Sequence, residues 1–331
     1  MNYIGSKKKL LKFIEYSILD TAGDIKNYTF CDLFAGTGTV AKQFKTLCHS
    51  VITNDIEYYS YIINRNIIGI SEIMECEHLI DELNQLKGID GFIYNNYCMG
   101  SNSKRNYFTD KNGRKIDAIR VKIKEWKNDS RITENQYYHL LASLLESVDK
   151  VANVASVYGA FLKKIKKSAS NEIKLKSIQP ISNNKKCIVY NKDANELIKN
   201  ISGDILYLDP PYNARQYGAN YHILNTIAKY DYFVPKGITG LRNYITSDYC
   251  RKNVVKDKFE DLIKNSKFQY IYLSYSNEGL MSLEEIENIM SKYGKYEKRT
   301  MKFYPRFKAD KNREYTAETT TEYLHILKKE Y

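Results

Sequence analysis

The sequence predicts an α/β protein built on a mostly parallel, doubly wound sheet. Short apolar runs typical of buried strands alternate with helical patterns over both ends of the chain. Parallel strands need crossover connections, and helices in those connections cover both faces of the sheet. The expected parallel strands are 28–34, 50–55, 186–190, 204–209 and 268–274.

The C-terminal part predicts a different element, an antiparallel hairpin. Two strand-like runs, 298–304 and 320–327, are joined by a polar and basic loop. Before them, Ser282 and Glu285 have the spacing of a capping box, followed by apolar residues at helical intervals. We therefore expect a helix and then a hairpin at this end.

The middle of the chain does not alternate. From 88 to 185 no convincing buried strand follows Ile93, whereas apolar residues recur at helical spacing from 116 to 126. Thr133 and Gln136 form a second capping-box pattern before another apolar helical face. The expected division is a catalytic core of 1–87 with 186–331 and a helical insertion of 88–185.

The charge indicates a polyanionic partner. The formal net charge is +12 and the isoelectric point is near 9.1, and nucleic acid is the commonest partner of such a protein. AT-rich coding, with abundant Lys, Asn, Ile and 30 Tyr, is an alternative source of this composition. The stretch 161–186 holds eight lysines against one acid. These lysines are either a DNA-binding surface or simply a solvated face.

Cysteine spacing and apolar run length point to a cytoplasmic protein without a metal centre. No two cysteines have the Cys-x-x-Cys spacing of a zinc or redox site. No apolar run approaches the ~20 residues that span a bilayer, and the N-terminus lacks a signal-peptide pattern. The cysteines are Cys31, Cys48, Cys76, Cys98, Cys187 and Cys250.

A glycine-rich turn follows the first expected strand. Gly36 and Gly38, with Ala41, fit the spacing that lets a backbone turn tightly and approach a ligand. Asp55 ends the second strand, where an acid can bind a ribose. The two features together indicate a cofactor that contains adenosine. They do not separate NAD from S-adenosylmethionine, and a plain tight turn is the structural alternative.

The run Asp209-Pro210-Pro211-Tyr212 separates the two cofactors. It follows a strand at the sheet edge where α/β proteins bind ligands. The prolines hold the backbone extended, an acid and carbonyls accept hydrogen bonds from an amine, and an aromatic ring can stack on a planar base. A dehydrogenase has no use for this set, so it favours S-adenosylmethionine as the cofactor.

Asp209 to Tyr212 resembles the catalytic motif of amino-methyltransferases, in the form typical of DNA adenine methyltransferases. The motif order resembles the Dam-like (alpha) class of DNA adenine-N6 methyltransferases of restriction-modification type, in which the insertion is the target recognition domain. This resemblance implies a Rossmann-like, S-adenosylmethionine-dependent methyltransferase fold. Further segments similar to family motifs are 3–10, 34–38, 54–55, 193–195 and 273–277.

The resemblance also implies roles for residues. On the target side, Asp209 and the carbonyl of Pro210 would accept hydrogen bonds from the amine, with Pro211 completing the loop and Tyr212 stacking on a flipped-out base. Asp55 would bind the ribose and Asp193 the adenine side, although either can be a helix N-cap. The cofactor-binding residues implied are Tyr3, Lys7, Phe34, Gly36, Gly38, Asp55, Asp193 and Asp209.

The expected DNA contacts lie in two places. Arg215 and Gln216 follow the catalytic motif and suit phosphate or base contacts. The basic run of the insertion supplies Lys163, Lys164, Lys166 and Lys167. His222 could act as a general base, but an isolated His before apolar residues is more often a helix residue with a satisfied hydrogen bond.

The hypothesis is therefore transfer of a methyl group from S-adenosylmethionine to the N6 amine of adenine in a specific double-stranded DNA sequence. A cognate restriction endonuclease would be the functional partner, and no membrane is involved. No cysteine follows a proline in the sequence, which argues against a carbon-5 cytosine enzyme. The alternatives are an amino-methyltransferase for RNA adenine, cytosine N4 or a protein glutamine, a non-catalytic DNA-binding module, and a nicotinamide dehydrogenase.

Overall fold

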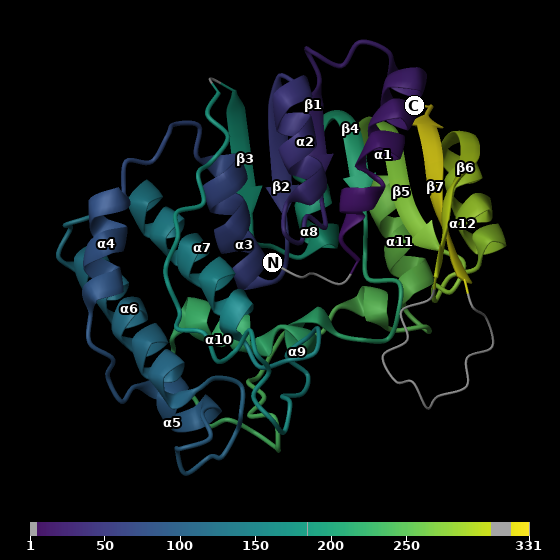
Figure 1. Cartoon of the computed structure of the whole chain (residues 1–331). Helices are drawn as coiled ribbons and strands as arrows, with labels where there is room; N and C mark the ends of the chain where they lie inside the picture. Colours follow the sequence, from purple (N-terminus) through teal and green to yellow (C-terminus); the bar gives the residue numbers. More distant parts are fainter. Residues whose placement is uncertain (1–4, 184, 306–318, 331) are drawn as a thin grey trace.

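The computed structural model describes residues 5–183, 185–305 and 319–330. Within these residues, seven strands form one sheet in the order β3-β2-β1-β4-β5-β7-β6 (Figure 1). The strands are β1 (Thr29–Asp32), β2 (Ser50–Asn54), β3 (Lys186–Tyr190), β4 (Ser202–Leu208), β5 (Lys267–Ser276), β6 (Gly294–Pro305) and β7 (Thr319–Lys329).

The pairing confirms the expected doubly wound sheet. Strands β3, β2, β1, β4 and β5 pair in parallel, and β7 pairs antiparallel with both β5 and β6. The chain leaves β1 toward β2 and β3, then returns to place β4 on the other side of β1. The strand order therefore reverses between β1 and β4, and such a switch point is where open α/β sheets bind ligands.

The inner strands β1, β4 and β5 bury side chains on both faces because helices cover both, whereas the edge strand β3 is only partly buried. On one face, Phe30, Ile205 and Leu324 pack against α1, α2 and the π-helix η2. On the other face, Cys31, Leu206 and Leu327 pack against α8, α11 and α12. The helical segments of the core are η1 (Lys7–Lys9), α1 (Leu11–Ala22), α2 (Thr39–Leu47), η2 (Arg65–Gly69), α8 (Ala194–Ile198), η3 (Asp248–Cys250), α11 (Val255–Asn265), α12 (Leu283–Met290) and η4 (Ser291–Tyr293). Successive strand residues point to opposite faces, which explains the near-continuous apolar runs in the sequence.

A helical lobe lies beside the β3 edge of the sheet (Figure 1). Its apolar core draws on α3 (Tyr58–Asn64), α4 (Glu77–Gln85), α5 (Phe92–Tyr97), α6 (Asp110–Asn128), α7 (Glu134–Val151) and α10 (His222–Lys229). The capping box of Thr133 and Gln136 is present and begins α7, and that of Ser282 and Glu285 begins α12. The lobe thus recruits segments on both sides of the predicted insertion, because α10 follows the catalytic motif in the chain.

The basic end of the insertion is not helical. The described residues from 152 to 185 form neither helix nor strand. They cross the lobe as an irregular segment whose backbone is tied down by side chains, for example by Asn112 and Asn84, which accept from the amides of Ile173 and Leu175. The expectation of a helical insertion therefore holds only up to Val151. Among the described residues, no helix has the length and apolar character that crossing a membrane requires.

Candidate active site

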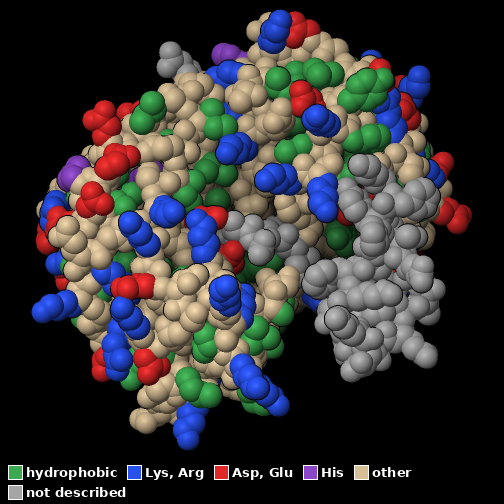
Figure 2. Space-filling view, in the orientation of Figure 1, with side chains coloured by type: hydrophobic (Ala, Val, Ile, Leu, Met, Phe, Trp, Pro, Cys, Tyr) green, Lys and Arg blue, Asp and Glu red, His purple; other side chains and the backbone are tan. Residues whose placement is uncertain are grey.

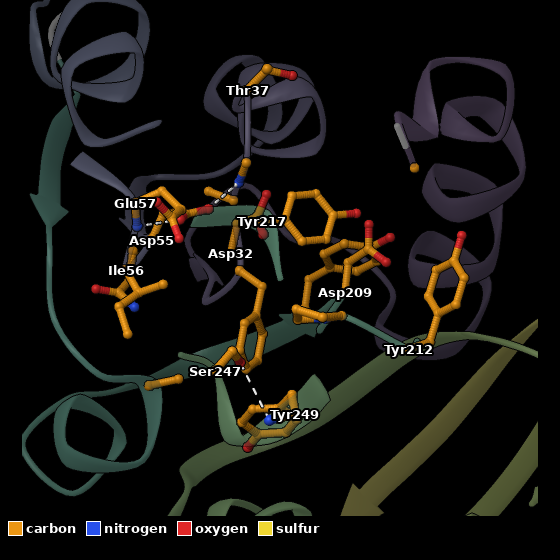
Figure 3. A pocket seen from close by; sticks show the side chains of 18 of the residues that line it. Asp32, Thr37, Asp55, Ile56, Glu57, Asp209, Tyr212, Tyr217, Ser247 and Tyr249 are labelled. Atoms are coloured by element: carbon orange, nitrogen blue, oxygen red, sulfur yellow. Dashed lines mark hydrogen bonds between the residues drawn. The ribbon is translucent and has the colours of Figure 1, made fainter. Parts of the chain in front are cut away.

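One deep pocket opens at the switch point, at the carboxyl ends of β1, β2 and β4. It holds about 1070 Å³ of empty space, counting its open mouth. The residues that line it come from the glycine-rich turn, the ends of β2 and β4, the N-terminal segment and the segment 247–249 (Figure 3). A pocket of this size accommodates a ligand larger than a nucleoside.

The glycine-rich turn brings its backbone to the pocket. Gly36 has φ +52° and its amide donates to Asp55 Oδ2 at 2.8 Å, so the turn is fixed to the end of β2. Gly38 has φ +72°, and a Cβ there would lie 2.5 Å from Asn64 Oδ1. Gly36 lines the pocket but Gly38 does not. The second glycine is thus needed for packing of α2 against α3 rather than for close approach to a ligand.

Asn54 and Asp55 join the ends of three strands. The Asn54 amide donates to the carbonyls of Leu33 and Lys192, and its Oδ1 accepts from the Lys192 amide. Asp55 Oδ1 accepts from the Glu57 amide at 2.8 Å. The Asp55 carboxylate therefore has a fixed orientation at the pocket wall.

The pocket is acidic although the whole protein is basic. Among the described residues that line it, six carry carboxylates and three carry ammonium groups. Burial raises the pKa of Asp55 to about 6 and that of Glu57 to about 7, and it also raises the pKa of Asp32. Asp32 Oδ1 is buried without a hydrogen-bond partner. Such a pocket favours a cationic ligand and disfavours a pyrophosphate.

Asp209 stands at the end of β4 in an ion-pair network. Lys7 Nζ lies 3.0 Å from Asp209 Oδ1 and 3.6 Å from Glu322 Oε2 of β7. Burial raises the pKa of Asp209 to about 6, with Lys7 opposing and Glu322 adding to the rise. Burial alone would lower the pKa of Lys7, but the two carboxylates raise it well above its usual value, so Lys7 remains an ammonium.

Aromatic rings form the wall beside Asp209. Tyr212 packs edge-on against Tyr275 with ring centroids 6.1 Å apart, and the Lys7 ammonium lies 5.7 Å from its ring. Tyr217, from the short helix α9 (Tyr217–Asn220), lines the same pocket near Asp209 (Figure 3). On the other side, Phe34 packs edge-on against Tyr249 at 4.9 Å. The pocket can therefore bind a planar ligand ring at two places, one beside Tyr212 and one beside Phe34 and Tyr249.

Most of the other residues predicted to bind the cofactor or to be catalytic line the same pocket. Asp193 caps α8, accepting from the amides of Asn195 and Glu196, and it also lines the pocket. Lys7, Phe34 and Pro211 line the pocket, whereas Pro210 is buried and is not among the lining residues. Tyr3 lies outside the described residues.

Some of the residues predicted to contact DNA are exposed, and others have polar groups that are hydrogen-bonded within the protein. Lys163, Lys164, Lys167 and Arg215 are exposed, whereas the Lys166 ammonium donates to the carbonyl of Val154. The Gln216 amide is occupied by Ser247, donating to its carbonyl at 3.2 Å and accepting from its N–H at 2.7 Å. Gln216 is thus used to hold the segment 247–249 over the pocket.

His222 is a buried core histidine with a partner at one ring nitrogen, while its Nδ1 is buried without a hydrogen-bond partner among the described residues. It is fully buried in α10, its Nε2 lies 3.0 Å from the Tyr158 carbonyl, and burial lowers its pKa to about 4. It does not line the pocket. The interpretation as a hydrogen-bonded helix residue therefore holds for Nε2 only, and a role as general base has no geometric support.

Sequence reasoning missed Glu322, Tyr217 and the segment 247–249. Glu322 reaches Lys7 only because β7 pairs antiparallel with β5, where Glu322 lies opposite Ser276. Tyr217 lies five residues past the catalytic motif, and that proximity was the one available signal. Nothing in the spacing of Ser247 and Tyr249 indicates a site.

The fold and the site together define a class of protein: an α/β enzyme with an amino-group methyl-transfer motif at the switch point. The sequence profile of the D12 class N6 adenine-specific DNA methyltransferase family matches residues 3–289. The chain belongs to this family and is an adenine-specific DNA methyltransferase.

Individual relatives agree. The Type II methyltransferase M.NlaIII of Neisseria lactamica is 56% identical over 335 residues, covering 100% of both chains. The Type II methyltransferase M.CviAII of Paramecium bursaria Chlorella virus 1 is 39% identical over 318 residues, 93% of each chain. Among solved structures, the rRNA methyltransferase aviRa from Streptomyces viridochromogenes is 8% identical with a TM-score of 0.33, over 98% of this chain and 86% of that one. A TM-score of 0.33 does not establish a closer structural relationship between the two proteins.

Proposed function

We propose that the methyl donor is S-adenosylmethionine and that it binds in the pocket at the switch point. The observation that carries this proposal is the excess of carboxylates in the pocket of a basic protein. The donor carries a positive sulfonium and an ammonium, whereas NAD carries a negative pyrophosphate. The unpartnered Oδ1 of Asp32 suits the ammonium, and Asp55 suits the ribose hydroxyls.

We assign the rest of the donor site to the glycine-rich turn and the aromatic pair. Phe34 and Tyr249 would contact the adenine ring of the donor, with Asp193 beside it, and Gly36 would let the backbone approach. Gly38 acts through packing, as its contact with Asn64 indicates. When bound, the donor supplies an electrophilic methyl group.

We propose that the target is a flipped-out adenine in double-stranded DNA. The N6 atom is inaccessible in a duplex, so extrusion is needed, at a cost of a few kcal/mol. Asp209 and the Pro210 carbonyl accept hydrogen bonds from the amine and hold its lone pair toward the methyl group. Tyr212 stacks on the base, and Pro211 fixes the loop. The chain therefore acts by positioning and electrostatics.

Lys7 favours the ionised, acceptor form of Asp209, and Glu322 opposes it while holding Lys7 in place. Lys7 is 4% exposed and contacts both carboxylates, so it can fix the orientation of Asp209 without competing water. Glu322 in turn keeps Lys7 in place and raises the pKa of Asp209. We assign both as positioning residues. This differs from the contact with the methionine part of the donor that the family resemblance implies for Lys7.

DNA binding is assigned to the insertion and to Arg215. Lys163, Lys164 and Lys167 are exposed on the irregular segment after α7, where they can contact phosphates. Gln216 and Lys166 are excluded as contacts because their polar groups are engaged. Sequence choice would come from the lobe formed around 88–185. The relatives named as Type II methyltransferases suggest that methylation protects DNA from a cognate restriction endonuclease.

The test is methylation-aware sequencing of DNA from cells that express the protein, with mass spectrometry of the digested nucleosides. The expected result is N6-methyladenine at one short sequence, absent when Asp209→Ala is expressed. N4-methylcytosine, or methylation confined to RNA, would overturn the proposed substrate. Absence of all methylation in a folded protein would favour a non-catalytic DNA-binding module.

A further inference from the structure

A segment just past the catalytic motif exposes an unusual amount of apolar surface. Tyr232, Val234, Ile238 and Ile245 are 68%, 83%, 85% and 65% exposed. They are four of the ten large apolar side chains that are exposed among the described residues, and they lie within 14 residues of each other in the chain. We call residues 231–246 the apolar hairpin. Concentrated exposed apolar surface marks a binding site more often than it marks chance.

The apolar hairpin is rigidly held. Lys236 and Leu241 exchange both backbone hydrogen bonds, at 2.9 and 2.7 Å, and Gly237 and Gly240 turn the tip with φ +64° and +68°. Ile238 therefore stands at the end of a tight hairpin. Ordering such a tip without burying it is unfavourable in the free protein, so the order prepares it for a partner.

The helical lobe supplies the anchors. Arg105 donates to the carbonyls of Ile238 and Gly237, each at 3.1 Å, and to that of Asn96. The Tyr97 hydroxyl donates to the Gly240 carbonyl at 2.7 Å. These contacts join the hairpin to the α5 region, beside which it lies at the lower edge of the molecule (Figure 1). The hairpin therefore moves with the lobe that we assign to target recognition.

Positive charge surrounds the tip. Lys104 is exposed, Arg105 binds only carbonyls, and Lys236 donates to the neutral Asn243 side chain. None of these three cations has a carboxylate partner among the residues that the structure describes. The nearby acid Asp231 is already paired with Arg242 at 2.7 Å. Lys and Arg side chains also stand between apolar ones along the lower edge of the face in Figure 2. The partner that matches both features is a DNA duplex, which has phosphates on its outside and stacked, apolar base faces inside.

The hairpin leads directly into the active site. After Ile245 the chain passes Ser247 and Tyr249, which line the pocket. Tyr244 packs over Gly218, where an added Cβ would lie 2.8 Å from its ring, so the hairpin is also fixed to α9 behind the catalytic motif. The base of the hairpin is therefore continuous with the segment that lines the pocket and is packed against α9.

We propose that the apolar hairpin is a wedge that enters the DNA duplex beside the extruded adenine, with Ile238 inserted at the base step and Lys104 and Lys236 on the flanking phosphates. The proposal rests on the DNA substrate of the proposed function. Apolar side chains inserted between base pairs replace stacking that disappears when a base leaves the duplex. Cations beside the wedge bind the backbone and fix its register.

The test compares Ile238→Ser with Ile73→Ser, a matched control that is 67% exposed in the loop before α4. Binding is measured by anisotropy on a fluorescein-labelled duplex that carries the sequence found by methylation mapping. Base extrusion is followed in the same duplex with 2-aminopurine at the target position. We expect Ile238→Ser to weaken binding about tenfold, because one apolar side chain is no longer buried in the complex, and to reduce the 2-aminopurine signal. Ile73→Ser should change neither.

A salt series separates the wedge from its cations. Lys104→Gln and Lys236→Gln should each lower the slope of log affinity against log salt by about 0.9, whereas Ile238→Ser should leave that slope unchanged. Thermal melts and donor binding by calorimetry should match wild type for every variant, since the hairpin tip is exposed. A loss of donor binding in Ile238→Ser would show a folding defect and would overturn the proposal.

Failure of the inference is distinguishable from failure of the proposed function. If wild type methylates the duplex and Ile238→Ser binds and extrudes like the control, the wedge does not exist. If wild type neither binds nor methylates the duplex, the DNA substrate is wrong. Sedimentation tests a second copy of the chain, and flotation with phosphatidylserine vesicles tests a membrane. Self-association or vesicle binding that disappears in Ile238→Ser, with DNA affinity unchanged, would assign the hairpin to that partner and overturn the proposal.

Discussion

The pocket at the switch point and the apolar hairpin are adjacent in the chain but opposite in chemistry. The pocket is buried and lined by more carboxylates than ammonium groups, and several of its acids have raised pKa values. The hairpin is exposed and apolar, and the three cations around its tip, Lys104, Arg105 and Lys236, have no carboxylate partner among the described residues, whereas Arg242 at its base is paired with Asp231. One protein thus presents an acidic interior to a small cation and a basic surface to a polyanion.

The difference is what the proposed function requires of a strongly basic protein that binds both DNA and a cationic methyl donor. Burial separates the electrostatic effects of the two regions, because salt screens exposed cations and screens buried charges much less. Salt should therefore act on the surface and not on the pocket. Substitutions should likewise affect one region at a time.

The largest expected effect is in the pocket. Asp209→Ala should lower methyl transfer by at least about 10²–10³-fold, because it removes an acceptor that positions the amine during transfer. The measurement is transfer of a labelled methyl group to DNA, with a thermal melt to check folding. Asp24→Ala, which removes an exposed carboxylate outside the pocket, is the control and should stay within about tenfold. Activity of Asp209→Ala within about tenfold of wild type would remove Asp209 from the mechanism.

The next effect tests the charge of the pocket. S-adenosylmethionine at a hundredfold excess over its Kd should stabilise the protein by about 2.7 kcal/mol, because it binds only the folded state. NAD should give no shift in Tm, since its pyrophosphate would meet the acids of the pocket. Differential scanning fluorimetry at several ligand concentrations measures both. A shift with NAD alone would return the glycine-rich turn to the dehydrogenase interpretation.

A smaller effect tests the surface. Replacing Lys163, Lys164 and Lys167 together by Gln should lower the salt slope of DNA affinity by about 0.9 for each phosphate that these lysines bind. Methyl transfer at saturating DNA should be preserved. Lys166→Gln is the control from the same run, because its ammonium is bound to the Val154 carbonyl. An unchanged slope in the triple variant would show that these lysines are a solvated face and leave Arg215 and the hairpin cations as the DNA surface.

The smallest effect tests the link between Glu322 and Asp209. Methyl transfer requires ionised Asp209, whose pKa is raised to about 6, so activity should fall as the pH drops through about 6. Glu322→Gln removes a charge that raises this pKa, so the acid limb of kcat/KM should move to lower pH. Glu322→Asp should restore the wild-type position. The opposite displacement, or none, would mean that Glu322 serves only to pack β7.

The same raised pKa makes a prediction for stability. A carboxyl whose pKa rises on folding, from its ordinary 3.8 to about 6, is destabilising once ionised. Its contribution to the free energy of unfolding should therefore be lost as the pH rises from about 4 to 6. Comparing the pH dependence of Tm in wild type and Asp209→Asn measures this contribution. A flatter profile is expected in the variant.

How far the sequence predicts each region depends on the range of its interactions. Five parallel strands, the C-terminal hairpin and two capping boxes were readable because alternation and capping are local. The basic run after α7 was expected to belong to a helical insertion but is irregular, because side chains such as Asn84 and Asn112 bind its backbone from other segments. Charge content alone carried no information about that backbone.

The same distinction holds within the site. The sequence by itself determined the class of chemistry, since Asp209 to Tyr212 and the glycine-rich turn are short runs in which neighbouring residues act together. Only the tertiary structure decided what surrounds Asp209. Lys7 and Glu322 come from opposite ends of the chain, and they meet because the N-terminal segment crosses the switch point while β7 reverses beside β5. Likewise, Ile238 is a candidate wedge only because the fold leaves its side chain exposed while most apolar side chains are buried. Contacts between distant segments depend on packing of the whole sheet, and no local pattern records them.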